Sequence, residues 1–178
     1  MKWELCRIAD LTASEKAALR TLALAVYPPE VAAAWPGRAI QWAPAQWGVI
    51  GWDAEGAAVC YVGVVLREGR WNDRAVRVGG IGGVKTHPAS RGRGFAMAAI
   101  QRALDFFHEL GNVDFGLLVC EPGLVPFYER QGWRRFLGEL LVTQRQAILP
   151  FTFNLTMTTP VRLQEPLAGT IDLLGPPW

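Results

Sequence analysis

The stretch from Val84 to Ala96 limits the fold of this chain more than any other, because an apolar run passes through arginines and glycines directly into a helical pattern. The first turn of a helix has unpaired backbone N–H groups and partial positive charge, so its main chain binds anions. Gly92 and Gly94 have no Cβ to separate these amides from a ligand. Arg91 and Arg93 add positive charge. The stretch therefore predicts a strand, a phosphate-binding loop and a helix.

Other phosphate-binding loops fit this region poorly. The run from Gly80 to Gly83 lacks the third glycine of a dinucleotide-binding turn, and no Gly-Lys-Ser or Gly-Lys-Thr follows it. A tight solvated loop without a ligand is the remaining alternative, and the loop sequence alone leaves it open.

A second informative stretch runs from Leu117 to Trp133, with the sequence LLVCEPGLVPFYERQGW. Its apolar start predicts a strand that ends before Pro122, and a short helix follows that carries Phe127 and Tyr128. Gly132 stands where a glycine commonly ends a helix. One full helix and one strand fit between the two stretches.

Together the two stretches resemble the GNAT superfamily of N-acetyltransferases. The pattern Arg91-x-x-Gly94-x-Ala96 is similar to the family's acyl-CoA pyrophosphate loop, and the second stretch is similar to its Phe-Tyr-x-x-x-Gly-Phe element, with Trp133 replacing phenylalanine. The resemblance implies an α/β fold with a mixed central sheet, crossover helices and an acyl-CoA cleft between two splayed parallel strands. It also implies acetyl-CoA as the co-substrate.

The resemblance implies roles for individual residues as well. A backbone N–H near Val84 would polarise the thioester carbonyl, and Tyr128 would lie beside the CoA sulfur. A phenol has an ordinary pKa of about 10, which suits proton donation to a departing thiolate. Packing without a catalytic task is the alternative for this tyrosine. The expected cofactor-binding residues are Val84, Lys85, Thr86, Arg91, Gly92, Arg93, Gly94, Phe95, Ala96 and Phe127.

The general base is less determined by the sequence. Glu121 ends the strand before Tyr128, where a carboxylate would remove a proton from the amine or hold the water that does so. The alternative is that Glu121 only stabilises the start of the following helix. Both interpretations stay open.

Length and composition indicate one domain over residues 1–178, since 51% of the residues are apolar and nothing marks a second unit. A net charge of +2 without a basic cluster argues against nucleic acid as a partner. No apolar run is long enough to span a membrane, and Met1–Glu4 does not resemble a signal peptide. We therefore expect a cytoplasmic protein, for which a homodimer is an open possibility.

Three cysteines lie far apart in the sequence, which predicts neither a disulfide framework nor a metal site. We expect Cys6, Cys60 and Cys120 to be reduced thiols. Cys60 falls within an apolar strand and is expected in the core, whereas Cys120 ends the strand beside the cleft and is expected to be open to solvent.

Periodicity and capping signals predict alternating strands and helices. The pattern Thr12-Ala-Ser-Glu15 is a capping box before the first helix, and Pro28 and Pro29 end that helix. Gly111 is a stop signal for the helix after the loop. We expect strands at 2–8, 47–53, 57–67, 74–86, 117–120, 133–143 and 151–157, helices at 12–27, 30–35 and 93–110, and turns at 53–56 and 68–73.

The acceptor is expected to be a small-molecule amine. Four tryptophans near the N-terminus, Trp35, Trp42, Trp47 and Trp52, belong either to the core or to the wall of a sugar site. The strand-rich tail that ends in Trp178 resembles that of the aminoglycoside 2'-N-acetyltransferases. The start Trp3-Glu4-Leu5-Cys6, the hairpin from Gly51 to Gly56 and the closing Gly169-Thr-Ile-Asp172 resemble, more weakly, the nodulation-type N-acyltransferases. Both families modify amino sugars, although Gly82 stands where the 2'-enzymes carry a carboxylate.

These resemblances imply that the cationic acceptor contacts Glu30, Trp35, Glu121, Asp172 and the Trp178 carboxylate. Two alternatives remain. One is an N-acyltransferase for a protein N-terminus, a polyamine or another small amine, and the other is an acyl-CoA-binding module without turnover.

Overall fold

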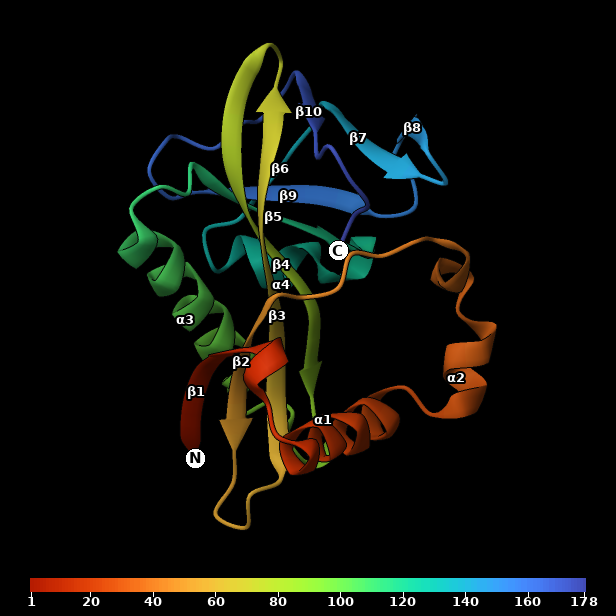
Figure 1. Cartoon of the computed structure of the whole chain (residues 1–178), viewed down its shortest axis with the longest axis vertical. Coiled ribbons are helices and arrows are strands. Elements are labelled where there is room, and N and C mark those ends of the chain that lie inside the picture. The colour runs from red at the N-terminus through yellow and green to blue at the C-terminus, as the bar shows by residue number, and fades with distance from the viewer.

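The computed structural model describes all residues from Met1 to Trp178, and a ten-stranded mixed sheet runs through it with helices on both faces (Figure 1). The α-helices are α1 (Ala13–Val26), α2 (Pro29–Ala34), α3 (Phe95–Leu110) and α4 (Val125–Glu129). Short 3-10 helices cover Ile8–Asp10, Pro36–Ala39, Pro88–Ser90 and Pro122–Leu124. The strands are β1 (Lys2–Arg7), β2 (Trp47–Trp52), β3 (Ala58–Trp71), β4 (Arg74–Thr86), β5 (Phe115–Cys120), β6 (Arg134–Arg135), β7 (Glu139–Gln144), β8 (Ala147–Pro150), β9 (Leu155–Pro160) and β10 (Thr170–Asp172).

The sheet has the order β6-β9-β5-β4-β3-β10-β7-β8, and β2 joins β1 to the first half of β3. The strand β4 is antiparallel to β3 and parallel to β5, with α3 as the crossover between β4 and β5. This arrangement confirms the predicted α/β architecture with a mixed sheet. No helix is both long enough and apolar enough to cross a membrane.

Local signals set the helix ends as predicted. Thr12 Oγ1 accepts a hydrogen bond from the Glu15 backbone N–H, and the Glu15 carboxylate accepts one from the Thr12 N–H, which completes the capping box. The helix α3 lies between Gly94, with φ of +77°, and Gly111, with φ of +68°. Both glycines adopt the left-handed conformation that favours glycine.

Adjacent glycines of β4 bring the two faces of the sheet close to their neighbours. A Cβ on Gly79 would lie 2.7 Å from the Phe107 ring of α3, and a Cβ on Gly80 would lie 2.2 Å from the Trp178 indole. Successive residues of a strand point to opposite faces. The helix α3 and the C-terminal residue therefore pack directly on opposite faces of the same strand.

The structure corrects several predicted boundaries. The strand β3 continues to Trp71, so the predicted turn over 68–73 is wrong; β3 and β4 pair up to Trp71 and Arg74, and Asn72 adopts a positive φ of 50° in the turn. The predicted strand over 133–143 is also wrong, because β6 pairs with β9 while β7 pairs with β10 and β8. The β-rich segment predicted at 151–157 begins later, as β9 at Leu155.

Candidate active site

A wedge opens between the parallel strands β4 and β5. They pair only where Val78–Gly80 faces Phe115–Leu117. Beyond Gly80, β4 keeps only β3 as a neighbour, and beyond Leu117, β5 keeps only β9. The wedge therefore widens toward the C-terminal ends of both strands, as the predicted cleft between splayed strands requires.

A β-bulge lies in β4 beside this wedge. Tyr61 and Gly63 of β3 are two residues apart, but their partners Lys85 and Gly82 are three apart, so β4 carries one extra residue. Gly83 adopts the positive φ of 57° that such a bulge requires. A bulge leaves its extra residue outside the ladder and re-aims the neighbouring backbone. The irregularity lies one residue before Val84, whose N–H was predicted to polarise a carbonyl.

The Arg91–Gly94 loop presents an open main chain at the start of α3. Gly92 and Gly94 have φ of +73° and +77°, and no atom lies within 4 Å of the Cβ position of either. No side chain caps this end of α3, so its first N–H groups stay free for a ligand. The guanidinium of Arg93 lies over the Phe95 ring, 5.6 Å from its centroid.

Replacing Gly94 tests this loop. Gly94→Leu should weaken acetyl-CoA binding by about tenfold, because the side chain would occupy the space beside the α3 amides. The matched control is Gly111→Leu at the other end of α3, which has the same left-handed backbone and equally open surroundings. Both variants should lose about 1–2 kcal/mol of stability from backbone strain. Calorimetry with acetyl-CoA that finds equal affinities for the two folded variants would contradict the assignment.

Tyr128 approaches the wedge from α4, which packs on the same face as α3. Its side chain is 6% exposed, and its ring meets Phe127 and Trp133 edge to face, with centroid separations of 5.0 and 6.3 Å. Burial raises the pKa of the Tyr128 phenol well above its ordinary value, and Cys120 and Tyr27 raise it further. The phenol therefore stays protonated, as a proton donor must.

Cys120 is buried, so the prediction that it is open to solvent is wrong. Its Sγ lies 3.7 Å from Met157 Sδ beneath the end of β5, and 4% of the residue is exposed. Burial raises the pKa of this thiol to about 11, and the neighbouring Glu121 contributes. The strand end reaches the cleft, but the side chain points into the core that lies under α4.

Thiol reactivity follows from these shifts. At pH 8 a thiol with a pKa of about 11 is roughly 100-fold less ionised than an ordinary cysteine, and the thiolate is the reactive form. In the folded protein, Cys6 and Cys120 should react with iodoacetamide about 100-fold more slowly than free cysteine. In protein unfolded by guanidinium, both should react at the rate of free cysteine. Because the raised pKa favours the protonated folded state, stability should fall as pH rises through 9 to 11. Rapid labelling of folded Cys120 by iodoacetamide, read by mass spectrometry, would contradict the predicted low reactivity of this thiol.

Glu121 and Tyr27 lie at the mouth of the wedge. Glu121 is exposed directly after β5, and its side chain caps no backbone N–H of the short helix that follows. Tyr27 lies directly after α1. The pKa of its phenol is raised, chiefly by burial and further by the Glu121 charge, while the Arg91 charge partly opposes the rise. Sequence reasoning missed Tyr27. The only available signal was its position before Pro28, where α1 must stop.

Trp178 lies at the base of the wedge on the face opposite α3. Its indole N–H donates to the Leu117 carbonyl at 3.2 Å, and the Arg67 guanidinium lies 5.3 Å from its ring centroid. The carboxyl carbon of Trp178 is 3.0 Å from the Cβ position of Gly82. Figure 1 shows the C-terminus near the middle of the molecule. The structure thus brings this predicted acceptor residue to the bulge.

Other predicted acceptor residues are placed differently. Trp35 is 39% exposed and stacks on Trp42 at 5.7 Å, with Phe153 at the edges of both rings. Glu30 is exposed on α2. Trp47 and Trp52 are not part of this cluster: Trp47 packs on Phe106 of α3, and Trp52 donates to Glu4.

Asp172 does not join these residues. Its carboxylate accepts the Leu174 N–H at 2.8 Å, and β10 places it opposite Arg70 of β3. The partner of Arg70 on β4 is Ala75, which lies about 23 Å along the strand from Gly82, given a rise of 3.3 Å per residue. The short strand β10 had no clear sequence signal, so this placement was not foreseen.

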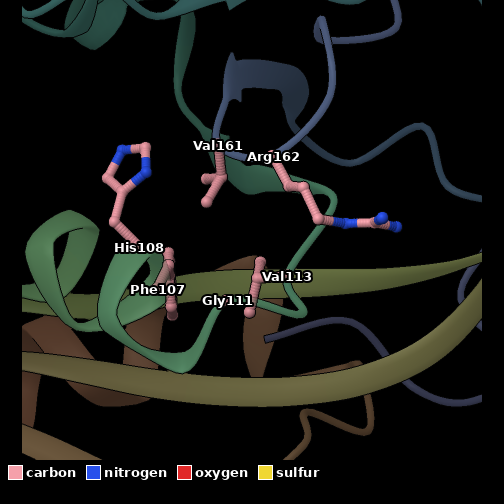
Figure 2. A pocket seen from close by; sticks show the side chains of 6 residues that line it. All are labelled: Phe107, His108, Gly111, Val113, Val161 and Arg162. Carbon is pink, nitrogen blue, oxygen red and sulfur yellow. The ribbon is translucent and has the colours of Figure 1, made fainter.

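A separate cavity of about 220 Å³ lies at the C-terminal end of α3 (Figure 2). It lies about 24 Å from the loop at the start of α3, given a 1.5 Å rise per residue. Arg162 beside it pairs with the buried Asp114 carboxylate. Its lining residues are Phe107, His108, Gly111, Val113, Val161 and Arg162.

Comparison with known proteins agrees with this geometry. A family model described as "Acetyltransferase (GNAT) domain" matches residues 8–136. No curated protein sequence matches significantly. Among solved structures, Escherichia coli ElaA is 19% identical with a TM-score of 0.62, over 89% of this chain and 98% of that one.

Two further structures carry ligands. Escherichia coli YhbS in complex with CoA is 13% identical with a TM-score of 0.61, over 97% of this chain and 89% of that one. Chaetomium thermophilum Naa20 in complex with a bisubstrate analogue is 15% identical with a TM-score of 0.58, over 91% of this chain and 87% of that one. At these identities the likeness shows the shared fold.

Proposed function

Because this chain belongs to the GNAT acetyltransferase family, we propose that it transfers an acetyl group from acetyl-CoA directly to a primary amine within a ternary complex. The observation that carries the proposal is the wedge between β4 and β5, together with the open glycine–arginine loop at the start of α3. Tyr128 shares an apolar cluster with residues of α3, β4 and β5, which supports a place beside this wedge. We place the reaction in the cytoplasm, in keeping with three free thiols.

In this proposal the α3 amides and Arg91 bind the pyrophosphate, while the wedge takes the pantetheine arm. A backbone N–H at Val84 stabilises the oxyanion, and Tyr128 protonates the departing sulfur. Lys85 contributes its backbone only, because its Nζ turns back to donate to the Gly83 carbonyl at 2.9 Å. The remaining loop and flank residues that complete the cofactor site are Thr86, Gly92, Arg93, Gly94, Phe95, Ala96 and Phe127.

The proposed acceptor is an aminoglycoside or related amino sugar. The partly exposed Trp35–Trp42 stack suits the apolar face of a sugar ring. Ala43, next to this stack, donates its N–H to the Pro177 carbonyl, so the aromatic residues adjoin the C-terminal tail. Carboxylates at Glu30, Glu121 and the Trp178 terminus would offset the cost of desolvating several ammonium groups.

A protein N-terminus is the second candidate acceptor. The observation that favours it is the likeness to Naa20 with a bisubstrate analogue and to the NatC complex bound to Gag peptide and CoA. A peptide amine carries one positive charge rather than several. It would therefore need fewer of the carboxylates that an aminoglycoside requires.

Release of free CoA from acetyl-CoA, measured against aminoglycosides, polyamines and peptides, separates these possibilities. We expect aminoglycosides to be acetylated at the highest kcat/KM. Turnover with peptides alone would move the assignment to N-terminal acetylation. Acetyl-CoA binding without turnover of any amine would indicate a non-catalytic module.

A further inference from the structure

The β-bulge in β4 leaves one peptide unit outside the regular ladders beside the wedge. Gly83 and Val84 have no register partner on β3, and β4 no longer pairs with β5 beyond Gly80. A bulge re-aims the backbone groups of such a unit. A planar trans peptide carries its carbonyl and its N–H on opposite sides. Whatever binds the Gly83 carbonyl therefore also sets the direction of the Val84 N–H.

The side chain that binds this carbonyl is Lys85. Its Nζ donates to the Gly83 carbonyl at 2.9 Å and lies 4.9 Å from the centroid of the Tyr61 ring, a separation typical of a cation–π contact. A hydrogen bond from a charged donor is stronger than one between neutral groups. Lys85 thus links the peptide of the bulge to a side chain of β3.

Glycine at position 83 makes room for this contact. Gly83 has a φ of +57°, and its Cβ position lies 3.2 Å from Lys85 Nζ and 3.7 Å from the nearest Tyr61 ring carbon. A methyl group at that position would press on the ammonium and move it. Gly83 therefore provides both the conformation of the bulge and the space for the ammonium beside its own carbonyl.

The Lys85 ammonium has no acidic partner. No carboxylate oxygen lies within 4.0 Å of its Nζ, and burial lowers its pKa. Removing a cation from water without a counter-ion costs free energy, whereas an apolar side chain would pack on the Tyr61 ring without that cost. The charge acts instead on the ring and on the Gly83 carbonyl.

We propose that Lys85 is a positioning residue for the oxyanion of the acetyl transfer, a role that rests on the function proposed above. Its ammonium holds the Gly83 carbonyl, so that the Val84 N–H on the other side of the same peptide points at the thioester oxygen. A positive charge at the carbonyl end also polarises the peptide and makes its N–H a better donor. Lys85 itself contacts neither the acetyl group nor the amine.

The step that Lys85 assists is the formation of the tetrahedral intermediate. The amine nitrogen attacks the thioester carbon, and the electron pair of the C=O bond moves to the oxygen, which accepts the Val84 hydrogen bond. The C–S bond then breaks, the sulfur takes the Tyr128 proton, and the proton of the acceptor nitrogen passes to water. Tyr128 regains a proton from water. Because the oxygen becomes negative only as the amine adds, the effect of Lys85 belongs to kcat rather than to binding.

Lys85→Met tests the role by removing the charge while keeping an unbranched side chain on the Tyr61 ring. We expect kcat to fall about tenfold, less than the 10²–10³-fold typical of losing an oxyanion donor, because the Val84 N–H stays but is less well aimed. The acceptor KM and the acetyl-CoA affinity should stay within about twofold. Lys85→Arg keeps a cation on both partners and should restore most of the lost kcat.

Lys16→Met is the matched control. Lys16 also donates from its Nζ to a main-chain carbonyl, that of Ala9, at 3.4 Å, but it lies on α1 and contacts no residue of the bulge. Losing this bond should leave kcat at the wild-type value.

A spectroscopic measurement follows the polarisation without turnover. Acetyl-CoA labelled with ¹³C at the acetyl carbonyl, bound without an amine, should give a carbonyl resonance downfield of that of free acetyl-CoA, because a hydrogen bond to the oxygen withdraws electrons from the carbon. In Lys85→Met this resonance should move back toward the position of the free compound. In Lys16→Met it should stay where the wild type has it.

The outcomes separate the inference from the function on which it rests. If the wild type releases no CoA with any amine, the proposed function itself fails. Wild-type kcat in Lys85→Met, or a carbonyl resonance that is the same in both proteins, would overturn the positioning role. Lys85→Arg as slow as Lys85→Met would also overturn it. A lower acceptor KM with unchanged kcat in Lys85→Met would overturn it as well, and would assign the ammonium to repulsion of a cationic acceptor.

Discussion

Tyr128→Phe is expected to lower kcat by about 10²–10⁴-fold, the range for loss of a positioned proton donor, and to leave acetyl-CoA affinity nearly intact. Removing one hydroxyl keeps the ring contacts with Phe127 and Trp133. Stability should therefore change little. Steady-state kinetics with a fixed amine and calorimetry with acetyl-CoA measure the two effects separately.

The pH profile and a matched tyrosine sharpen this prediction. Because burial raises the pKa of Tyr128 above the ordinary value of about 10, its ionisation should not reduce kcat between pH 7 and 10. Tyr27→Phe removes a hydroxyl at the mouth of the wedge and should lower kcat far less. Equal losses in the two variants, or wild-type turnover in Tyr128→Phe, would mean that Tyr128 only packs.

Local sequence signals predicted the parts of the site that lie close together in the chain. The Arg91–Gly94 loop, the left-handed Gly94 and Gly111, and the capping box at Thr12 each depend on residues a few positions apart. Their geometry follows from backbone sterics and unpaired amides. The strand–loop–helix unit could therefore be placed from the sequence.

Long-range pairing could not be predicted in the same way. The break between β6 and β7 depends on strands β9 and β10, which come later in the chain. The charge of Asp172 made it a candidate to bind the cationic acceptor, but the pairing of β10 with β3 keeps it away from Gly82. Cys120 follows the alternation of β5, which turns it inward although the strand end reaches the cleft.

Trp178 combines both cases. Its resemblance-based role predicted a place in the acceptor site, but the sequence did not show which strands hold it. From the sequence, Gly80 belonged only to a poorly fitting phosphate loop, and Gly82 only marked the place where the 2'-enzymes carry a carboxylate. In the fold, the Trp178 indole fills the space that a Cβ on Gly80 would need, and the Trp178 carboxyl carbon lies close to the Cβ position of Gly82.

Deleting Leu174–Trp178 is expected to raise the acceptor KM at least tenfold and to preserve acetyl-CoA binding. The deletion removes the terminal carboxylate from the bulge and leaves the space over Gly80 empty, so stability should fall by about 3–5 kcal/mol, as for loss of a buried tryptophan. Retained affinity for acetyl-CoA would show that the deleted protein is folded, because the pyrophosphate loop shares no residue with the tail.

Leu174→Gly is the matched control, since Leu174 is 54% exposed with a φ of +50° and its replacement leaves the carboxylate in place. Its acceptor KM should equal that of the wild type. For the wild type, the KM of a polycationic acceptor should rise between 0.05 and 0.5 M salt, over roughly the range in which the Debye length falls below 10 Å. The tail-deleted protein should show a weaker rise, because one carboxylate is gone. An unchanged acceptor KM after deletion, in a protein that still binds acetyl-CoA, would remove the C-terminus from the acceptor site and leave the cofactor site as assigned.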